Sequence, residues 1–261
     1  MRIESTPLVS IVTVVFNGEK YLEQTIQSVL NQTYRNVEYI IIDGGSTDGT
    51  LDIIKKYQND IALWISEPDK GVYDGMNKGI KLAKGELIGM INSDDWYELN
   101  TVELIVEKYR NEENNSFKIF HGDLLIHEIT GDTVLKKFNP SLFKMLNYGV
   151  TYNHPTFFVT PDVYKKYTFN VGLISIADNQ FILEILTKEK DVFAYINEVL
   201  ANFRKGGISG QQSTISSIKS HYVARANAGF STFMKLKALS INICYQIVNK
   251  SLFYSKKHFK K

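Results

Sequence analysis

Carboxylates follow the most apolar segments of this sequence, where they could meet a cation or a phosphate. Asp94 and Asp95 come shortly after the run 86–91, ELIGMI, and Asp43 closes the run 37–43, VEYIIID. Neighbouring carboxylates repel each other unless a divalent cation shares them with phosphate oxygens, as Mg²⁺ commonly does in proteins. Taken locally, the pair indicates such a metal site about as well as it indicates a cap on the next helix.

Two polar turns are candidates for contact with a ligand. Asp43-Gly44-Gly45-Ser46 contains glycines that let a backbone approach a ligand, although an ordinary strand-to-helix turn explains it better. Asp69-Lys70-Gly71 leads into a helical pattern, and a helix N-terminus beside a lysine can hold a phosphate. A solvated loop is equally consistent with that segment. Neither turn is a G-x-G-x-x-G dinucleotide fingerprint or a P-loop.

Two further side chains could act on a substrate. Asp178 stands just before the apolar run FILEIL, where a helix N-cap is the better local interpretation and a general base in a cleft is the alternative. His154 belongs to the segment NHPT and is equally ambiguous, because a lone histidine is more often structural than catalytic.

The elements that must position these residues alternate between strand and helix patterns. Apolar strands are expected at 9–16, 37–43, 61–65 and 86–91, and helices at 72–84 and about 101–109. Such alternation is typical of an α/β domain with a mainly parallel sheet. Ligands of open α/β sheets bind beyond the carboxyl ends of the strands, so Asn17, Asp43 and Asp94 are expected to converge there.

The second half of the sequence has a mixed pattern. A hairpin is expected over 118–138 around Thr130-Gly131-Asp132, with strands at 156–160 and 192–204 and a helix at about 178–188 between them. The stretch from about 211 onward indicates helices.

Composition limits the class of protein. The 261 residues are 44% hydrophobic and 22% charged, which predicts a globular core rather than a disordered chain. The single cysteine, Cys244, excludes a disulfide framework, and no apolar run has the length of a membrane-spanning helix. No signal-peptide pattern opens the sequence, so a cytoplasmic location is expected.

Charge is unevenly distributed along the chain. Residues 199–261 contain 11 of the 30 Lys and Arg residues and none of the 28 Asp and Glu residues. Within this tail, apolar residues recur at helical spacing at Leu236, Leu239, Ile243, Ile247 and Val248. A basic amphipathic helix suits an anionic membrane surface, and a helix packed on the domain is the alternative. The tail has no recognisable nucleic-acid module, so no nucleic-acid partner is expected.

The ordered motifs of the chain resemble one family, the family 2 glycosyltransferases of the GT-A fold, especially the bacterial enzymes of surface-polysaccharide assembly. The resemblance covers about residues 8–205. It rests on SIVTVVFN, EKYLEQTIQSVLNQTY, IIIDGGSTDGT, SEPDKGVYDGMNKGI, AKGELIGMINSDDWY and NHPTFFV, followed by Asp178. It implies a GT-A (Rossmann-like) domain at 1–205, with a nucleotide-sugar-binding half at 1–110 and an acceptor half at 111–205. Residues 206–261 are then a basic helical extension.

The resemblance also implies roles for matching positions. Asp43 would lie in the base pocket beside Phe16 and Asn17. Asp69, Lys70 and Asn77 would line the donor cleft. Asp94 and Asp95 would bind the metal. Asp178 would be the catalytic base, and His154 would lie near the acceptor. Asp95 is expected to be the most direct metal ligand, and Asp94 to serve the donor as well.

Two positions depart from the family pattern. Gly44 stands where many relatives have a second Asp, which weakens the expectation of uridine specificity. Asn92 stands where many relatives begin the metal motif with Asp, so metal binding is expected to depend more on Asp94 and Asp95.

The expected function is therefore inverting transfer of one sugar from a nucleotide diphosphate sugar, with uridine diphosphate the expected nucleotide, to an acceptor hydroxyl. The resemblance implies a divalent cation (Mn²⁺ or Mg²⁺) and a glycan or lipid-linked acceptor in lipopolysaccharide, O-antigen or exopolysaccharide assembly. The predicted enzyme class is hexosyl- or N-acetylhexosaminyltransferase, peripheral on the inner face of the plasma membrane.

Other classes fit the sequence less well. A nucleotidyltransferase would open with a glycine-rich basic loop, where this chain has Asn17-Gly18-Glu19-Lys20. A processive synthase would carry membrane-spanning helices and a Gln-x-x-Arg-Trp motif, whereas Gln180 is followed by Phe-Ile-Leu. A non-catalytic carbohydrate- or nucleotide-binding relative is the remaining alternative.

Overall fold

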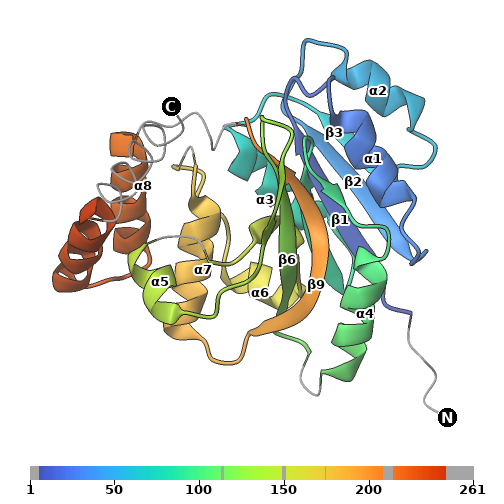
Figure 1. The fold of residues 1–261 in the computed structure, drawn as a ribbon. Coiled ribbons are helices and arrows are strands. Elements are labelled where there is room, and N and C mark those ends of the chain that lie inside the picture. Colours follow the sequence, from blue (N-terminus) through green and yellow to red (C-terminus); the bar gives the residue numbers. More distant parts are fainter. Residues whose placement is uncertain (1–5, 113–114, 149–150, 174, 208–213, 245–261) are drawn as a thin grey trace.

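Four parallel strands form the first half of a nine-stranded sheet (Figure 1). The computed structural model describes residues 6–112, 115–148, 151–173, 175–207 and 214–244. The four strands are β1 (Val9–Val15), β2 (Val37–Asp43), β3 (Leu63–Ser66) and β4 (Leu87–Asn92). Val15 is in register with Asp43, Asp43 with Ser66, and Val14 with Asn92. Their carboxyl ends therefore lie at one edge of the sheet.

Alternate residues of these strands enter two different cores, because successive side chains of a strand point to opposite faces. Val12 and Val14 of β1 pack in one core, and Ile11 and Val15 pack in the other. Both faces are covered, which explains why β1 is almost continuously apolar.

Helices cover the two faces. The first four are α1 (Leu22–Leu30), α2 (Thr50–Lys56), α3 (Val72–Leu82) and α4 (Thr101–Asn111). The apolar residues of α1, α2 and α4 pack on one face, and those of α3 pack on the other. Gly79 brings α3 close to the sheet, because a Cβ there would clash with a methyl group of Val12.

The second half of the sheet is mixed, as the sequence predicted. Its strands are β5 (Trp96–Tyr97), β6 (Ile119–His127), β7 (Thr133–Lys136), β8 (Phe158–Val159) and β9 (Phe193–Arg204). The order across the sheet is β3-β2-β1-β4-β8-β6-β9-β5, with β7 paired to β6. Since β8 pairs antiparallel with both β4 and β6, the two predicted halves share one continuous sheet.

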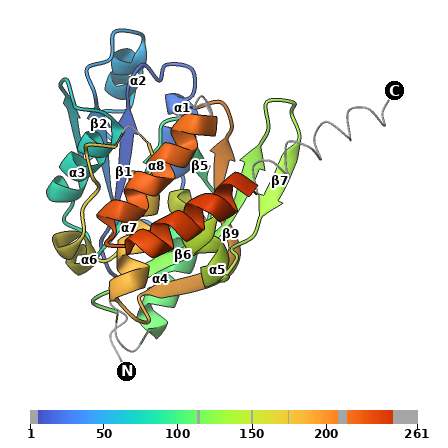
Figure 2. The same cartoon turned by 90° about the vertical axis from the view of Figure 1, so that its left-hand side faces the viewer.

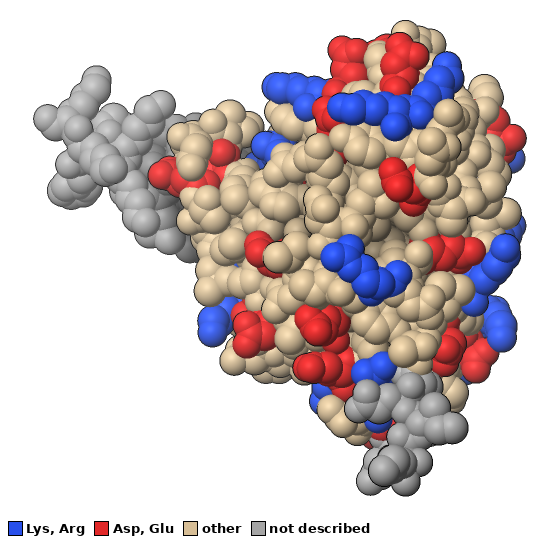
Figure 3. Space-filling view, turned by 90° about the vertical axis from the view of Figure 1, so that its right-hand side faces the viewer, with Lys and Arg blue, Asp and Glu red and all other residues tan. Residues whose placement is uncertain are grey.

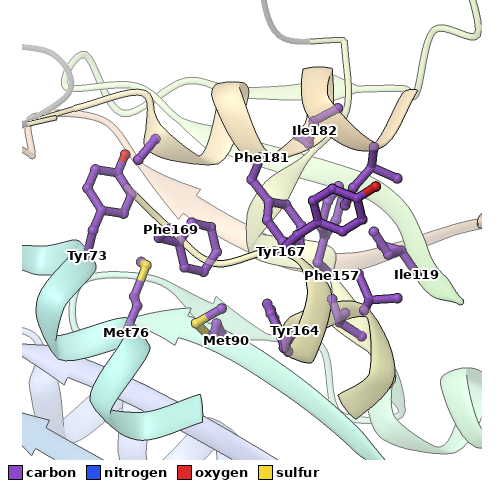
Figure 4. Close-up of a cluster of buried hydrophobic side chains, with 14 of the residues drawn as sticks. Tyr73, Met76, Met90, Ile119, Phe157, Tyr164, Tyr167, Phe169, Phe181 and Ile182 are labelled. Atoms are coloured by element: carbon purple, nitrogen blue, oxygen red, sulfur yellow. The ribbon is translucent and has the colours of Figure 1, made fainter. Parts of the chain in front are cut away.

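The remaining helices form layers beyond the sheet. They are α5 (Leu142–Asn147), the 3-10 turn η1 (His154–Thr156), α6 (Pro161–Lys166), α7 (Ala177–Lys188) and α8 (Thr214–Asn227). Aromatic side chains of α3, α6 and α7 meet between these layers, among them Tyr73, Tyr164 and Phe181 (Figure 4). Residues 232–244 form a further helix, and it lies outermost with α8 (Figure 2).

The predicted strands and long helices are confirmed to within about two residues, and the tail is helical where it is described. The short elements β5, α5, η1 and α6 were not predicted, since two to six residues are too few to show a period. The tail packs partly on the domain, because Ala224, Ala228 and Ala238 are buried. Leu236 and Ile243 of its predicted apolar face are exposed, whereas Ile247 and Val248 lie outside the described residues.

Candidate active site

The loop after β1 is fastened to the loop after β2. The Asn17 backbone adopts a left-handed conformation (φ 50°), and its N–H donates to Ser46 Oγ at 2.7 Å. Asn17 Oδ1 in turn accepts from the Thr47 N–H at 2.9 Å. Beside it the Phe16 ring is 64% exposed, an unusual position for a large apolar side chain. These two predicted donor residues therefore lie together at the strand end, with Phe16 free to contact a ligand.

Asp43 organises the second loop from within. Its carboxylate is fully buried and accepts from the N–H groups of Gly45 and Ser46 at 3.1 and 3.0 Å. The hydroxyls of Ser46 and Ser66 donate to it as well. Three of these bonds reach Oδ2 and one reaches Oδ1, so both oxygens of the carboxylate are held. Asp43 thus orders the loop beside Asn17, and its predicted contact with a nucleotide base stays a prediction.

The position of Gly44 is explained by Asp69. A Cβ at residue 44 would lie 2.8 Å from Asp69 Oδ2, so a larger side chain would displace that carboxylate. Asp69 Oδ1 accepts from the Gly71 N–H at 2.8 Å, which holds the turn that opens α3. Lys70 is exposed beside it. The structure therefore places a carboxylate next to residue 44 although the chain has glycine there.

The side-chain amide of Asn77 bonds to the backbone of Phe169. Its Nδ2 donates to the Phe169 carbonyl at 2.8 Å, and its Oδ1 accepts from the Phe169 N–H at 3.1 Å. Both ends of the amide are used to fasten the segment before α7 to α3. Its predicted lining of the donor cleft remains untested.

Asp94 and Asp95 lie between β4 and the end of β9. Asp95 is fully buried, and its Oδ1 accepts from the Arg204 N–H at 2.9 Å. Asn92 Nδ2 lies 3.4 Å from Asp95 Oδ2 and donates where an Asp would repel. The Arg204 guanidinium donates to the Asp94 carbonyl at 3.3 Å and stacks over the ring of Tyr21 at 4.1 Å.

Burial makes this pair of carboxylates costly in ionised form. It raises the pKa of Asp94, and burial together with the Asp94 charge raises the pKa of Asp95 well above its usual range. A divalent cation would relieve both effects, and it commonly needs only one or two protein carboxylates beside substrate phosphates. The described residues contain no group of three or more acidic, His or Cys side chains suited to a metal. The pair therefore fits a cation that is completed by a bound diphosphate.

Asp178 lies in the first turn of α7 rather than at its cap. The N-cap is Ile176, whose left-handed backbone (φ 61°) is unfavourable for a β-branched residue. No side-chain capping bond is made at this end, so the local interpretation of Asp178 as an N-cap is wrong. Its Oδ1 accepts from the hydroxyl of Tyr73 at 3.2 Å. Tyr73 lies in the first turn of α3, so it connects Asp178 to the loop that carries Asp69.

Four elements bring titratable side chains close enough to act electrostatically on Asp178. They are Tyr73 of α3, Lys136 of β7, His154 of η1 and His221 of α8. Burial lowers the pKa of Lys136 and His154, and the Asp178 charge opposes that shift. Burial and the nearby Arg225 charge lower the pKa of His221 to about 4. Two histidines and one lysine from distant elements thus interact electrostatically with this carboxylate.

His154 lies within a cluster of aromatic rings. It is buried between the rings of Phe157 and Phe169, each with its centroid 5.5 Å away. Its Nε2 has no hydrogen-bond partner among the described residues. The Asp178 charge acts on the pKa of His154, so the two residues are near each other, and the predicted role of His154 beside the acceptor stays a prediction.

Sequence reasoning missed Tyr73, Lys136, Arg204 and His221 as members of the site. Each is brought in by the pairing or packing of distant elements, which its neighbours in the sequence do not show. Only Arg204 gave a usable signal, because it ends a predicted strand just as Asp43 does.

The fold and the site together define a glycosyltransferase of the GT-A class. The chain belongs to glycosyltransferase family 2, since the model of that family, Glycosyl transferase family 2, matches residues 10–167. Chondroitin synthase of Escherichia coli is 38% identical over 110 residues, which are 41% of this chain and 16% of that protein. An uncharacterised glycosyltransferase of Haemophilus influenzae is 29% identical over 211 residues, covering 78% of this chain and 81% of that protein.

Solved structures show the same fold at low identity. Residues 1–349 of Staphylococcus aureus TarS in complex with UDP-GlcNAc superpose with a TM-score of 0.65 at 19% identity, covering 90% of this chain and 71% of that one. The mannosyltransferase PcManGT of Pyrobaculum calidifontis, in complex with GDP-Man and Mn²⁺, superposes with a TM-score of 0.62 at 13% identity. That match covers 90% of this chain and 68% of the other. No helix in the described part of the chain is long and apolar enough to cross a membrane.

Proposed function

We propose that this glycosyltransferase moves one sugar, with inversion, from a nucleotide diphosphate sugar to an acceptor hydroxyl. The observation that carries the proposal is the hydrogen bond from the Tyr73 hydroxyl to Asp178. This bond joins the loop that carries Asp69 to a half-buried carboxylate that is distant in the sequence. The donor would occupy the strand ends at Phe16, Asn17, Asp43, Asp69, Lys70, Asn77 and Asp94. Residues 1–110 would bind this donor and 111–205 the acceptor, with 206–261 as an extension.

In the proposed reaction Asp178 takes the proton from the acceptor hydroxyl as that oxygen attacks the anomeric carbon. The bond from the anomeric carbon to the diphosphate oxygen breaks on the opposite face, and the nucleoside diphosphate leaves. General-base assistance of this kind typically contributes about 10²–10⁴-fold. His154 would lie beside the acceptor, as its position in the family pattern implies.

Asp95 and Asp94 would hold a divalent cation, Mn²⁺ or Mg²⁺, that neutralises charge on the leaving diphosphate. Support comes from the costly burial of both carboxylates and from the Mn²⁺ in the PcManGT complex. Arg204 holds the two residues in place through its backbone N–H and its guanidinium.

A UDP-sugar is the proposed donor, and hexosyl or N-acetylhexosaminyl transfer the proposed class. One of the similar solved structures is a complex with UDP-GlcNAc and another is a complex with GDP-Man, so the nucleotide must be measured. The proposed acceptor is a glycan or lipid-linked glycan of bacterial lipopolysaccharide, O-antigen or exopolysaccharide assembly. The reaction would take place at the inner face of the plasma membrane.

The test of the base uses Asp178→Asn, with Asp162→Asn as control because Asp162 is an exposed acid on α6. We expect Asp178→Asn to bind donor normally in calorimetry and to lose transfer by at least about 10²-fold. Near-normal turnover would contradict the base assignment.

The test of the metal site uses Asp95→Asn, which keeps the size of the side chain and an acceptor for the Arg204 N–H. Donor binding that depends on Mn²⁺ in the natural protein should lose that dependence. The control is Asp60→Asn, in an exposed turn after α2. If no UDP- or GDP-sugar binds and none is hydrolysed, with or without Mn²⁺, the chain is a non-catalytic relative and the proposal fails.

A further inference from the structure

Large apolar side chains lie exposed on two neighbouring elements, α5 and the helix at 232–244. Phe233 is 76% exposed, Leu142 53% and Phe143 50%. The set that we name the apolar edge is Leu142, Phe143, Phe233, Met234, Leu236 and Ile243. Isolated exposed apolar residues need no explanation, but a contiguous set of this kind marks an interaction surface.

Four members of the apolar edge, Leu142, Phe143, Phe233 and Met234, line one hollow between its two elements. A cavity of about 240 Å³ lies between them, with Phe143, Leu146, Phe230 and Phe233 among its lining residues. The helix at 232–244 is held to the end of α5 by Asn242, whose Nδ2 donates to the Tyr148 carbonyl at 3.3 Å. The exposed side chains therefore belong to one folded surface rather than to separate loose segments.

The two elements of the apolar edge carry charges of one sign. Lys144 of α5 and Lys235 and Lys237 of the helix at 232–244 intersperse with its apolar residues, and neither element contains an acid. On the face at the right of Figure 1, acidic and basic side chains are mixed (Figure 3). A surface with apolar residues between cations suits the headgroup and acyl boundary of an anionic bilayer.

We propose that the apolar edge inserts into the surface of an anionic lipid bilayer. A second copy of the chain is a poorer occupant, because a symmetric pairing would bring the lysines of both copies together. This inference extends the proposed function. It rests on that function only in assuming that the acceptor is linked to a lipid. Since α8 carries His221 beside Asp178 and leads into the helix at 232–244, a bilayer at this edge would present lipid-linked acceptors to the acceptor half.

The test measures sedimentation of the full chain with phosphatidylcholine vesicles, with and without phosphatidylglycerol, at low salt. We expect binding to the anionic vesicles and little binding to the neutral ones. Each methylene group withdrawn from a bilayer weakens binding about fourfold, so the double variant Phe143→Ser, Phe233→Ser should bind at least tenfold more weakly, an order-of-magnitude expectation. The control is Leu99→Ser, which removes a side chain that is 60% exposed in the turn before α4.

Circular dichroism and thermal unfolding establish that each variant is folded. Equal sedimentation of the double variant and the natural chain would overturn the proposal, and so would absence of binding to anionic vesicles. Dimerisation in sedimentation velocity that the same double variant abolishes, without vesicle binding, would assign the edge to a second copy instead. The readout is binding, so failure here leaves the proposed sugar transfer to an acceptor hydroxyl intact and contradicts only its proposed place at the membrane.

Discussion

Replacing His121 with phenylalanine should make the protein more resistant to acid. His121 lies on β6 and is 1% exposed, with the rings of Phe138, Tyr152 and Tyr195 at centroid distances of 4.6, 4.9 and 5.5 Å. Neither ring nitrogen has a hydrogen-bond partner among the described residues. Burial lowers the pKa of His121 to about 3, because nothing nearby compensates a charged imidazolium.

The sign and size of the effect follow from the two pKa values. The unfolded chain binds a proton below about pH 6.5, whereas the folded chain resists protonation down to about pH 3. The contribution of His121 to stability is therefore fully present above pH 6.5 and is lost as the pH falls through this window. At pH 5 the loss amounts to about 2 kcal/mol, and the phenylalanine of the variant, which has no proton to bind, avoids it.

The assay is urea unfolding of the natural chain and His121→Phe, followed by circular dichroism at pH 8, 7, 6 and 5. The added ring atom can shift the unfolding free energy at every pH, so the informative quantity is the change in the difference between the two proteins. We expect that difference to move in favour of the variant by about 2 kcal/mol between pH 8 and pH 5. Parallel pH profiles would refute the inference that His121 is buried and uncompensated.

Three further substitutions test other parts of the structure. Gly79→Ala places a Cβ against a Val12 methyl group and should lower the unfolding free energy by about 1–3 kcal/mol in urea; unchanged stability would contradict the close packing of α3 on β1. Lys136→Met removes a side chain that interacts electrostatically with Asp178, so kcat/KM should fall, and an unchanged kcat/KM argues against a role for this interaction. Tyr73→Phe removes the hydroxyl that donates to Asp178 and should lower kcat about tenfold with donor binding unchanged, whereas full kcat would show that this bond does not position the carboxylate.

The sequence by itself determined the long elements and the donor edge of the sheet. The β-branched run of β1 and the run that ends at Asp43 are local patterns, and the parallel order follows from their alternation with helices. Polar residues that end parallel strands must meet at one edge, so Asn17, Asp43 and Asp94 were located without coordinates. The family resemblance named Asp178 and His154, which local sequence left ambiguous.

Only the tertiary structure decided what surrounds these residues. Arg204 reaches Asp94 and Asp95 because β9 pairs with β5 and ends beside them, a pairing between segments about a hundred residues apart. Lys136 and His221 approach Asp178 from β7 and α8 by packing, which no short-range period encodes. The apolar spacing of the tail predicted a helix. Which side of that helix is buried depends on its packing with α5 and α7, and the spacing of residues within the tail carries no information about those elements.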